Sequence, residues 1–325
     1  MTTRSFSAFA ALALALLLAP GCGTKGTTTD DTGTPHDTAG DTGDTGNTTV
    51  VPVWTAVSLQ TSASVTGIYA SGQDEAWITL SGGTAELYQG STWNDLHADV
   101  GGEDLNGVWG AGTGTGATVV AVGNAGYIAA WGSSGWDITD VGTPNFEAID
   151  GASKKDLFAV GWGGMYSNAS GDWTYVNIAG NPRFNDIWYN GDVGAVVGEE
   201  GLLGLYLNGE WSFTQEDQRR PLYAVSGTGA NDIYAVGEAG LVLHWNGKTW
   251  EDISPPTAKS IWGVWAATSS AVFVVGNSGL AMERSNGTWT ALPTGTDKNL
   301  TAVHGTGVND VWAVGGFGTV LRYQP

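Results

Sequence analysis

The sequence predicts an all-β chain made of seven copies of one structural unit. From residue 51 onward, a Val-Gly pair followed three residues later by Gly recurs every 37 to 39 residues. The first Gly of each copy is Gly123, Gly161, Gly198, Gly237, Gly276 or Gly315. A degenerate copy precedes them, with Leu80 in place of the first Gly and Gly83 as the second. Repeats of about 40 residues are typical of propeller blades, so we predict a seven-bladed β-propeller over residues 51–325.

Each unit contains four β-like runs separated by turn residues. In the fifth unit the runs are Leu222–Ser226, Asp232–Val236, Leu241–Trp245 and Thr249–Ile253. Asn246-Gly247 separates the last two runs, and Asn-Gly is a strong signal for a tight hairpin. The second run is apolar on both faces, as expected of a sheet that is covered on both sides. We therefore predict four-stranded blades.

The two ends of the chain are expected to close the ring together. Six units end in a Trp, namely Trp93, Trp136, Trp173, Trp211, Trp250 and Trp289, which we expect to pack between blades. The seventh unit stops one strand short, at Tyr323-Gln324-Pro325. The sequence Trp-Thr-Ala-Val that begins at Trp54 is similar to the segment that begins at Trp289. Residues 52–59 should therefore supply the fourth strand of the last blade, beside Thr319–Tyr323, and leave no exposed sheet edge.

Residues 1–21 are typical of a secretory signal peptide. Arg4 precedes an apolar run over residues 6–19, which is too short for a comfortable transmembrane helix. The segment Leu-Ala-Pro-Gly-Cys ending at Cys22 resembles a bacterial lipobox. This resemblance implies that Cys22 is lipidated and becomes the mature N-terminus. Gly23 follows it, which favours the outer membrane or cell surface as the destination. Ordinary secretion and a retained signal anchor are the alternatives.

Residues 22–50 are expected to form a disordered tether after the lipidated cysteine. The segment is nearly all Thr, Gly and Asp, so it has too little apolar surface to offset the entropy of ordering. Its Asp spacing lacks the alternate ligands and terminal Glu of a calcium loop. Similar Asp-Thr-Gly tethers occur in lipoproteins of myxobacteria.

Two further resemblances concern the repeats. Gly-Ser-Thr-Trp at 90–93 and Gly-Lys-Thr-Trp at 247–250 resemble the end of the Asp-box of bacterial neuraminidase repeats, without its Ser and Asp. Whole units such as 222–250 resemble repeats of propeller lipoproteins and, more remotely, photosystem-assembly propellers. These resemblances imply the fold and are nearly silent on function.

Composition narrows the classes of function. The formal net charge is −20 and only 12 residues are Lys or Arg, which argues against a nucleic-acid partner. The histidines show no metal-ligand spacing, and no nucleophile–base pair or phosphate loop is evident. We therefore expect no metal, no cofactor and no catalytic residues. A monomer is the expected state.

The remaining candidate site is one rim of the propeller. The turn between the second and third strands should lie on the same face as the links between blades. This placement displays Asn124, Trp162, Glu199, Glu238 and Asn277, with Glu200, Arg219 and Arg220 as neighbours. Acids, amides and an exposed Trp suit binding of a protein loop or a sugar, whereas an ordinary polar surface is the plain alternative.

The sequence thus favours an envelope-anchored, non-catalytic binding or scaffold propeller that recognises a protein or a glycan. One alternative is a degenerate carbohydrate-active enzyme, glycosidase- or lyase-like, which two carboxylates in the central channel would favour. The other is a purely structural repeat protein, which a surface without a deep pocket would favour.

The lipid anchor makes a direct prediction. We expect Cys22→Ser to release the protein from membranes, because two or three acyl chains contribute roughly 0.8 kcal/mol per buried methylene. Membrane fractionation of the two forms measures this release. Equal membrane association of variant and wild type would show that lipidation is not the anchor.

Overall fold

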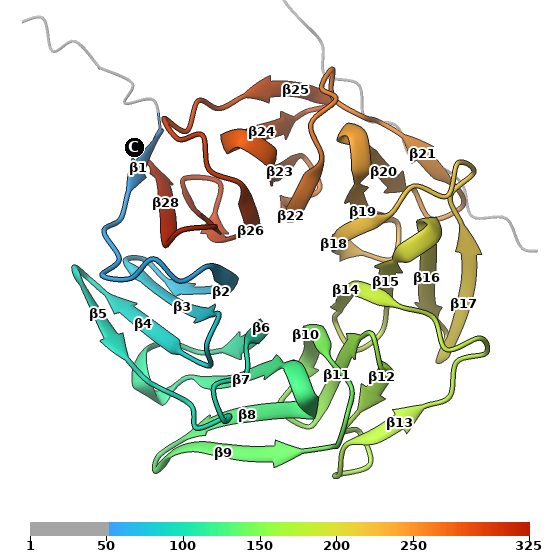
Figure 1. Cartoon of the computed structure of the whole chain (residues 1–325). Helices are drawn as coiled ribbons and strands as arrows, with labels where there is room; N and C mark the ends of the chain where they lie inside the picture. The colour runs from blue at the N-terminus through green and yellow to red at the C-terminus, as the bar shows by residue number, and fades with distance from the viewer. Residues whose placement is uncertain (1–51) are drawn as a thin grey trace, which may run out of the picture. The chain divides into compact units, whose positions relative to one another are not determined.

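The computed structural model describes residues 52–325, which form seven four-stranded antiparallel sheets arranged as the blades of a disc (Figure 1). The prediction of a seven-bladed β-propeller is therefore confirmed. In each blade the first strand lies nearest the central channel and the fourth lies at the outer edge. The predicted signal peptide, Cys22 and the tether lie outside the described residues. Within residues 52–325, no helix is long and apolar enough to cross a membrane.

The strands follow one another from the inside of each blade to the outside. The first three blades contain β2 (Val65–Gly72), β3 (Glu75–Leu80), β4 (Ala85–Gln89) and β5 (Thr92–Asp95); β6 (Leu105–Ala111), β7 (Thr118–Gly123), β8 (Tyr127–Gly132) and β9 (Gly135–Asp140); and β10 (Phe146–Ser153), β11 (Asp156–Gly161), β12 (Gly164–Ser167) and β13 (Thr174–Val176). Blades 4 and 5 contain β14 (Phe184–Tyr189), β15 (Gly194–Gly198), β16 (Leu202–Leu207) and β17 (Glu210–Gln215); and β18 (Leu222–Gly229), β19 (Asp232–Gly237), β20 (Val242–Trp245) and β21 (Trp250–Asp252). Blades 6 and 7 contain β22 (Ile261–Thr268), β23 (Ala271–Gly276), β24 (Leu280–Ser285) and β25 (Thr288–Ala291); and β26 (Leu300–Gly307), β27 (Asp310–Gly315), β28 (Thr319–Gln324) and β1 (Val53–Ala56).

Short 3-10 turns are the helical elements of the described residues. One of them, η1 (Gly114–Gly116), lies in the hairpin between β6 and β7. The other four join second and third strands: η2 (Asn124–Gly126), η3 (Glu199–Gly201), η4 (Glu238–Gly240) and η5 (Asn277–Gly279).

The repeated Val-Gly-x-x-Gly element holds each blade to the links on either side of it. A Cβ on Gly237 would lie 2.2 Å from the carbonyl oxygen of Pro221, at the end of the incoming link. Gly240 has a φ of 81°, and a Cβ there would lie 2.2 Å from the carbonyl oxygen of Thr257 in the outgoing link. Only glycine allows both backbones to approach so closely, which accounts for both glycines of the repeat.

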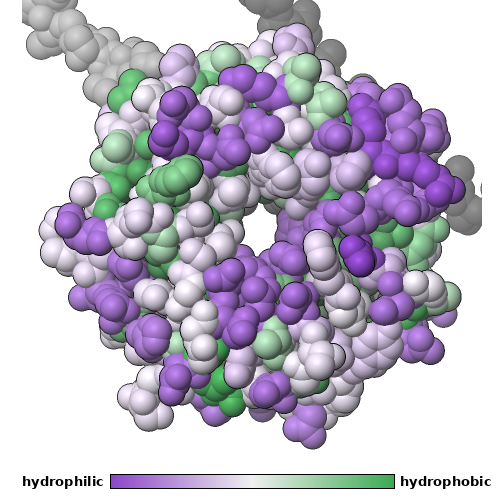
Figure 2. Space-filling model, viewed as in Figure 1, coloured by the Kyte–Doolittle hydropathy of each residue, from purple (hydrophilic) through white to green (hydrophobic). Residues whose placement is uncertain are grey.

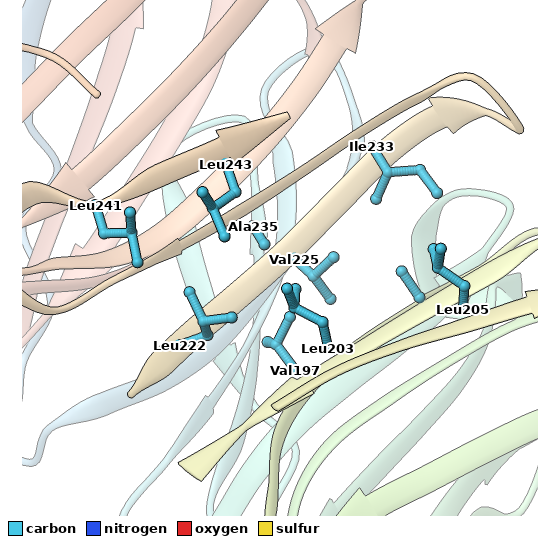
Figure 3. Packing of buried hydrophobic residues seen from close by; sticks show 10 residues of the cluster. Val197, Leu203, Leu205, Leu222, Val225, Ile233, Ala235, Leu241 and Leu243 are labelled. Carbon is cyan, nitrogen blue, oxygen red and sulfur yellow. The ribbon is translucent and has the colours of Figure 1, made fainter. Parts of the chain in front are cut away.

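Apolar residues of neighbouring blades pack face to face to form the core. Between blades 4 and 5, side chains from both sheets interdigitate, as Figure 3 shows for Val197 and Leu203 against Leu222 and Val225. The second strands are the most buried, since five of the six residues of β19 are buried. Burying each such leucine or valine contributes about 1.5–3 kcal/mol as an upper estimate, so the blade contacts dominate stability.

The outer-strand tryptophans pack between blades, as predicted. The indole Nε1 of Trp289 donates to the carbonyl of Ile253 at 2.7 Å, and that of Trp93 donates to the carbonyl of Ser58 at 3.0 Å. In both cases the acceptor lies at or beyond the outer strand of the preceding blade. These side chains therefore join blades and are not a free ring of sugar-binding aromatics.

The N-terminal strand completes the last blade. Strand β1 pairs antiparallel with β28, with Trp54 opposite Tyr323 and their ring centroids 5.2 Å apart. The pairing extends beyond the strand, because the amide of Val57 donates to the carbonyl of Val320 at 2.9 Å. The predicted closure of the ring is confirmed.

A buried arginine also ties blade 7 to blade 1. Arg322 in β28 donates to Asp310 within its own blade at 2.8 Å and to Asp74 in the β2–β3 hairpin of blade 1. Its guanidinium lies 5.0 Å from the ring centroid of Trp312. Since the Arg322 side chain is only 6% exposed, both carboxylates are needed to offset the cost of burying its charge.

The closure predicts how two truncations differ. Removal of residues 1–60 should destabilise the whole domain by roughly 3 kcal/mol or more, because it deletes β1 together with the Trp54 side chain. Removal of residues 1–50 keeps this strand and should leave stability unchanged. At about 2–4 °C per kcal/mol for a domain of this size, thermal unfolding should separate the two by at least about 6 °C. Equal melting temperatures would contradict the stabilising role of the strand.

Candidate functional site

The turns that carry the predicted rim residues all lie against the links between blades. In each of the seven blades, the first amide after the second strand donates to the carbonyl of the residue that precedes the first strand. The seven bonds are Ser81 to Ser64, Asn124 to Asp104, Trp162 to Asn145, Glu199 to Arg183, Glu238 to Pro221, Asn277 to Ser260 and Gly316 to Asn299, at 2.9–3.2 Å. The turns and links therefore share one face of the propeller, which we call the link face.

A β-bulge places one extra residue at the start of every innermost strand. In blade 5, for example, Leu222 pairs with Gly237 and Ala224 pairs with Val236, so Tyr223 is left without a partner. The residues at this position are Thr66, Asn106, Glu147, Asn185, Tyr223, Trp262 and Thr301. All seven line a cavity of about 200 Å³ where the central channel opens. We call them the mouth ring.

Four members of the mouth ring hold the next blade in place. Their side chains donate to the carbonyl just before the bulge of the following blade. These bonds are Thr66 to Leu105 at 2.5 Å, Asn106 to Phe146 at 2.7 Å, Asn185 to Leu222 at 2.9 Å and Thr301 to Val65 at 3.1 Å. The carbonyls at the edge of the inner strand are thereby capped, as buried backbone groups require. Glu147, Tyr223 and Trp262 make no such bond, so their side chains are the ones available to a ligand.

Tyr223 and Trp262 form an aromatic pair on adjacent blades at the channel mouth. Their rings stack with centroids 4.1 Å apart and planes 19° from parallel. The Trp262 indole donates to Asn277 Oδ1 at 2.6 Å, which fixes its orientation. Burial raises the pKa of the Tyr223 hydroxyl, and the nearby charges of Glu238 and Glu199 raise it further. The pair thus faces an electronegative part of the link face.

The structure brings several predicted rim residues into contact with the mouth ring. Asn124 Oδ1 accepts from Asn106 at 3.0 Å, and Glu199 Oε1 accepts from Asn185 at 3.2 Å. Together with Asn277 beside Trp262, these residues form a second tier around the mouth.

Other rim residues lie farther from the mouth ring. Trp162 is 52% exposed, and the Arg183 guanidinium lies 4.6 Å from its ring centroid. Glu200 and Arg219 form an exposed pair at 3.6 Å.

Arg220 has a structural contact that the sequence did not indicate. Its guanidinium donates to Glu216 Oε1 at 2.7 Å, and its backbone amide donates to the other oxygen of the same carboxylate at 3.0 Å. Glu216 is buried, and these bonds keep its pKa below the ordinary value despite the burial. Arg220 therefore anchors the link between blades 4 and 5.

Two carboxyl groups occupy the channel wall below the mouth. Asp150 of β10 and Asp186 of β14 both line a second channel cavity of about 470 Å³. Each side chain touches the channel but its carboxyl is surrounded by protein, and this burial raises the pKa of each to about 7. The charge of Asp150 raises the pKa of Asp186 further.

Backbone amides partly offset that burial, one from the same strand and two from the next blade. The amides of Tyr189 and Gly151 donate to Asp150 at 2.7 and 2.8 Å, and the amide of Val225 donates to Asp186 at 2.8 Å. His304 of blade 7 likewise accepts a backbone amide of the next blade. Its Nδ1 accepts from the amide of Ala70 in blade 1 at 3.1 Å. Burial lowers the pKa of His304 to about 4, so the ring is neutral at pH 7.

A metal centre is not apparent in the part of the chain that the structure describes. No group of three or more His, Cys, Asp or Glu side chains there converges closely enough to hold a metal ion.

The mouth ring and the channel carboxyls were not identified from the sequence. Their signal is positional, because each mouth-ring residue directly follows the first apolar residue of its unit. The seven positions carry five residue types, from Thr to Trp, so no motif marks them. Only alignment of the repeats against the bulge register reveals that they share one position.

Comparison with known proteins supports the fold. Neither a protein-family model nor a curated protein matches the sequence. Among solved structures, YCF48 bound to D1 peptide is similar, with a TM-score of 0.69, 16% identity and coverage of 85% of this chain and 100% of that chain. YCF48 from Cyanidioschyzon merolae gives a TM-score of 0.67 with 15% identity, covering 84% of this chain and 99% of that one. Catalytically inactive virginiamycin B lyase from Staphylococcus aureus with quinupristin gives 0.72 with 11% identity, covering 84% and 99%. At these identities the likeness shows the propeller fold alone.

The channel aspartates predict a pH dependence of stability. The folded pKa of Asp186 is above its ordinary value, so its stabilising contribution is complete at acid pH and is lost as the pH rises through about 7. Asp186→Asn keeps an acceptor for the amide of Val225 and stays neutral. We therefore expect the variant to gain stability relative to wild type as the pH rises from 5 to 8, measured by urea unfolding.

Asp217→Asn, at an exposed position in a link, is the matched control and should leave the pH profile unchanged. Parallel profiles for wild type and Asp186→Asn would show that the channel carboxyl does not carry the effect.

Proposed function

We propose that this chain is an envelope-anchored, non-catalytic binding protein that holds a segment of a partner protein against its link face. The mouth ring is the observation that carries the proposal. Seven equivalent bulges present seven side chains around one opening, and Glu147, Tyr223 and Trp262 are not used to cap the neighbouring blade. Bulges commonly re-aim side chains at functional sites, which fits this arrangement.

The chemistry of the link face favours a protein over a glycan. The surface around the mouth mixes carboxylates, amides and an aromatic pair, with Arg183 stacked on the exposed Trp162. Aromatic and Arg side chains are enriched at protein interfaces. Tyr223 and Trp262 cover part of each other's faces, which leaves less aromatic surface for stacking on a sugar. A propeller of similar fold, YCF48, has been solved with a bound peptide, which supports a peptide-binding role here by analogy.

The alternatives fit the structure less well. Asp150 and Asp186 supply the two channel carboxyls that a carbohydrate-active enzyme would need, but both accept backbone amides of neighbouring strands. These bonds give the two aspartates a structural part. A purely structural repeat protein would leave the hollow at the channel mouth without a use.

Anchoring at the cell envelope is the second part of the proposal. It rests on the signal-like residues 1–21 and on the lipobox-like segment that ends at Cys22. A tethered binding protein needs no reaction to act, since it raises the local concentration of its partner at the membrane.

A rim variant tests the proposed function. We expect Trp162, Glu199 and Glu238 changed together to Ala to weaken capture of a partner from envelope extracts at least tenfold. The melting temperature should stay within a few degrees, because the exposed substitutions at Trp162 and Glu238 change stability by about 0.5 kcal/mol or less each. Glu199 is half-buried, and its replacement removes one hydrogen bond from Asn185, which contributes about 1 kcal/mol. Capture is measured by pull-down with purified protein as bait.

The matched control changes Asp172, Glu210 and Lys248 to Ala, three exposed residues at the hairpins between third and fourth strands. It should capture as wild type does. Protease treatment of the extract should remove the captured partner, whereas loss of capture after enzymatic deglycosylation alone would favour a glycan. A large loss of stability in the rim variant would show that these residues are structural and overturn the binding-face assignment.

A further inference from the structure

Three acidic side chains line the central channel on two adjacent blades. Glu147 of β10 belongs to the mouth ring, Asp186 of β14 lines both channel cavities, and Asp150 of β10 lies in the second cavity. The two cavities share Asp186 and a belt of branched aliphatic residues. The belt residues common to both are Ile68, Val108, Ile149, Val264 and Val303.

These acids have no cationic partner in the part of the chain that the structure describes. No Lys or Arg lines either channel cavity, and none of the three carboxylates takes part in an ion pair there. The one basic side chain in the channel, His304, is neutral at pH 7 because burial lowers its pKa to about 4. Above pH 7 the channel wall therefore holds negative charge that no Lys or Arg of the described residues neutralises.

The cost of burying these three unpaired carboxyl groups is visible in their raised pKa values. Burial raises the pKa of Glu147, and that of Asp150 and Asp186 to about 7. Carboxylates in a low-dielectric site are stable when a cation or several hydrogen-bond donors accompany them. Asp150 and Asp186 have backbone donors, whereas no donor among the described residues reaches Glu147.

Glu147 also interrupts the series of mouth-ring side chains that donate to a carbonyl of the next blade. Asn106 and Asn185, on the blades to either side, each donate to a carbonyl of the following blade. A carboxylate cannot donate, so the equivalent carbonyl, that of Phe184, receives no side-chain donor from Glu147. This part of the mouth offers acceptors and lacks donors, as expected of a site for a ligand rich in N–H groups.

The rest of the channel suits the stem of such a ligand. The aliphatic belt lies just below the mouth, and it can contact methylene groups while a charged head lies beside a carboxylate. The Tyr223–Trp262 pair at the entrance offers to cations the ring faces that the two residues do not cover on each other. Figure 2 shows the centre of the disc open, with hydrophilic residues bordering much of the opening.

We propose that the channel binds an alkylammonium or guanidinium group on a slender aliphatic chain, with Glu147 and Asp186 as its counter-ions. A lysine or arginine side chain of the protein partner is one source of this group, in which case the inference rests on the proposed function and names what the link face recognises. A free polyamine is the other source.

Two simple probes test the proposal with the full chain. A blocked pentalysine peptide and spermidine are titrated into the protein at pH 8 and low salt, with blocked pentaglutamine as the neutral control, and binding is followed by calorimetry. We expect pentalysine to bind and pentaglutamine not to bind. Glu147→Gln and Asp186→Asn should each weaken binding of the cation at least tenfold, while Glu103→Gln, an exposed link-face control, should change it less than twofold.

The outcomes separate the two sources and the two proposals. Tighter binding of pentalysine than of spermidine assigns the group to a protein side chain, and the reverse assigns it to a free polyamine. The inference is overturned if neither cation binds, or if all three variants bind equally well while their circular dichroism matches wild type. In that case, capture of a partner that depends on Trp162, Glu199 and Glu238 would leave the proposed function standing.

Discussion

The free edge of the innermost strands is the constraint on which the rest of this propeller depends. The first strands of the seven blades have backbone groups that face an open channel, and no further strand is there to pair with them. Unpaired N–H and C=O groups are costly where solvent is scarce. The protein meets this constraint by borrowing polar side chains from the preceding blade. The result is a ring in which every blade depends on its neighbour, so the blades are expected to fold and unfold together.

Farther down the channel, the free edge of each innermost strand meets the preceding blade in one of two ways. Where the wall residue of one blade is polar, as at Asp150, Ser226 and His304, it accepts the amide of the residues Tyr189, Ala266 and Ala70 in the next blade. Where the wall residue is aromatic, as at Tyr69, Trp109, Trp188 and Trp265, the next blade has a glycine: Gly110, Gly151, Gly227 or Gly305. The rings of Tyr69, Trp188 and Trp265 lie against the Cβ position of the glycine that follows, within 2.2–3.0 Å, so only glycine fits there. Side chain and neighbour are thus matched across every blade boundary.

Much of the architecture could be predicted because its causes are local and repeated. The Val-Gly-x-x-Gly spacing is visible in the sequence since both glycines are required by close backbone contacts, as at Gly237 and Gly240. The closure was predictable because Trp54 repeats the pattern of the other outer strands. The mouth ring could not be predicted, because a bulge depends on the register between two strands. Residues as different as Thr66 and Trp262 share the bulge position. The channel acids escaped notice for a related reason, since Asp150 and Asp186 lie at different heights on neighbouring strands.

The mouth ring breaks the sevenfold repetition of the scaffold. Its backbone positions are equivalent, but one sector carries the carboxylate of Glu147 and another carries the aromatic pair of Tyr223 and Trp262. A symmetric ring would offer a ligand seven equal orientations, whereas the order of side chains around this ring is the same in no two orientations. A bound molecule can therefore be held at one angle about the channel axis. Exchange of Glu147, Tyr223 or Trp262, which do not bond to the next blade, would change that angle and leave the hydrogen bonds between blades in place.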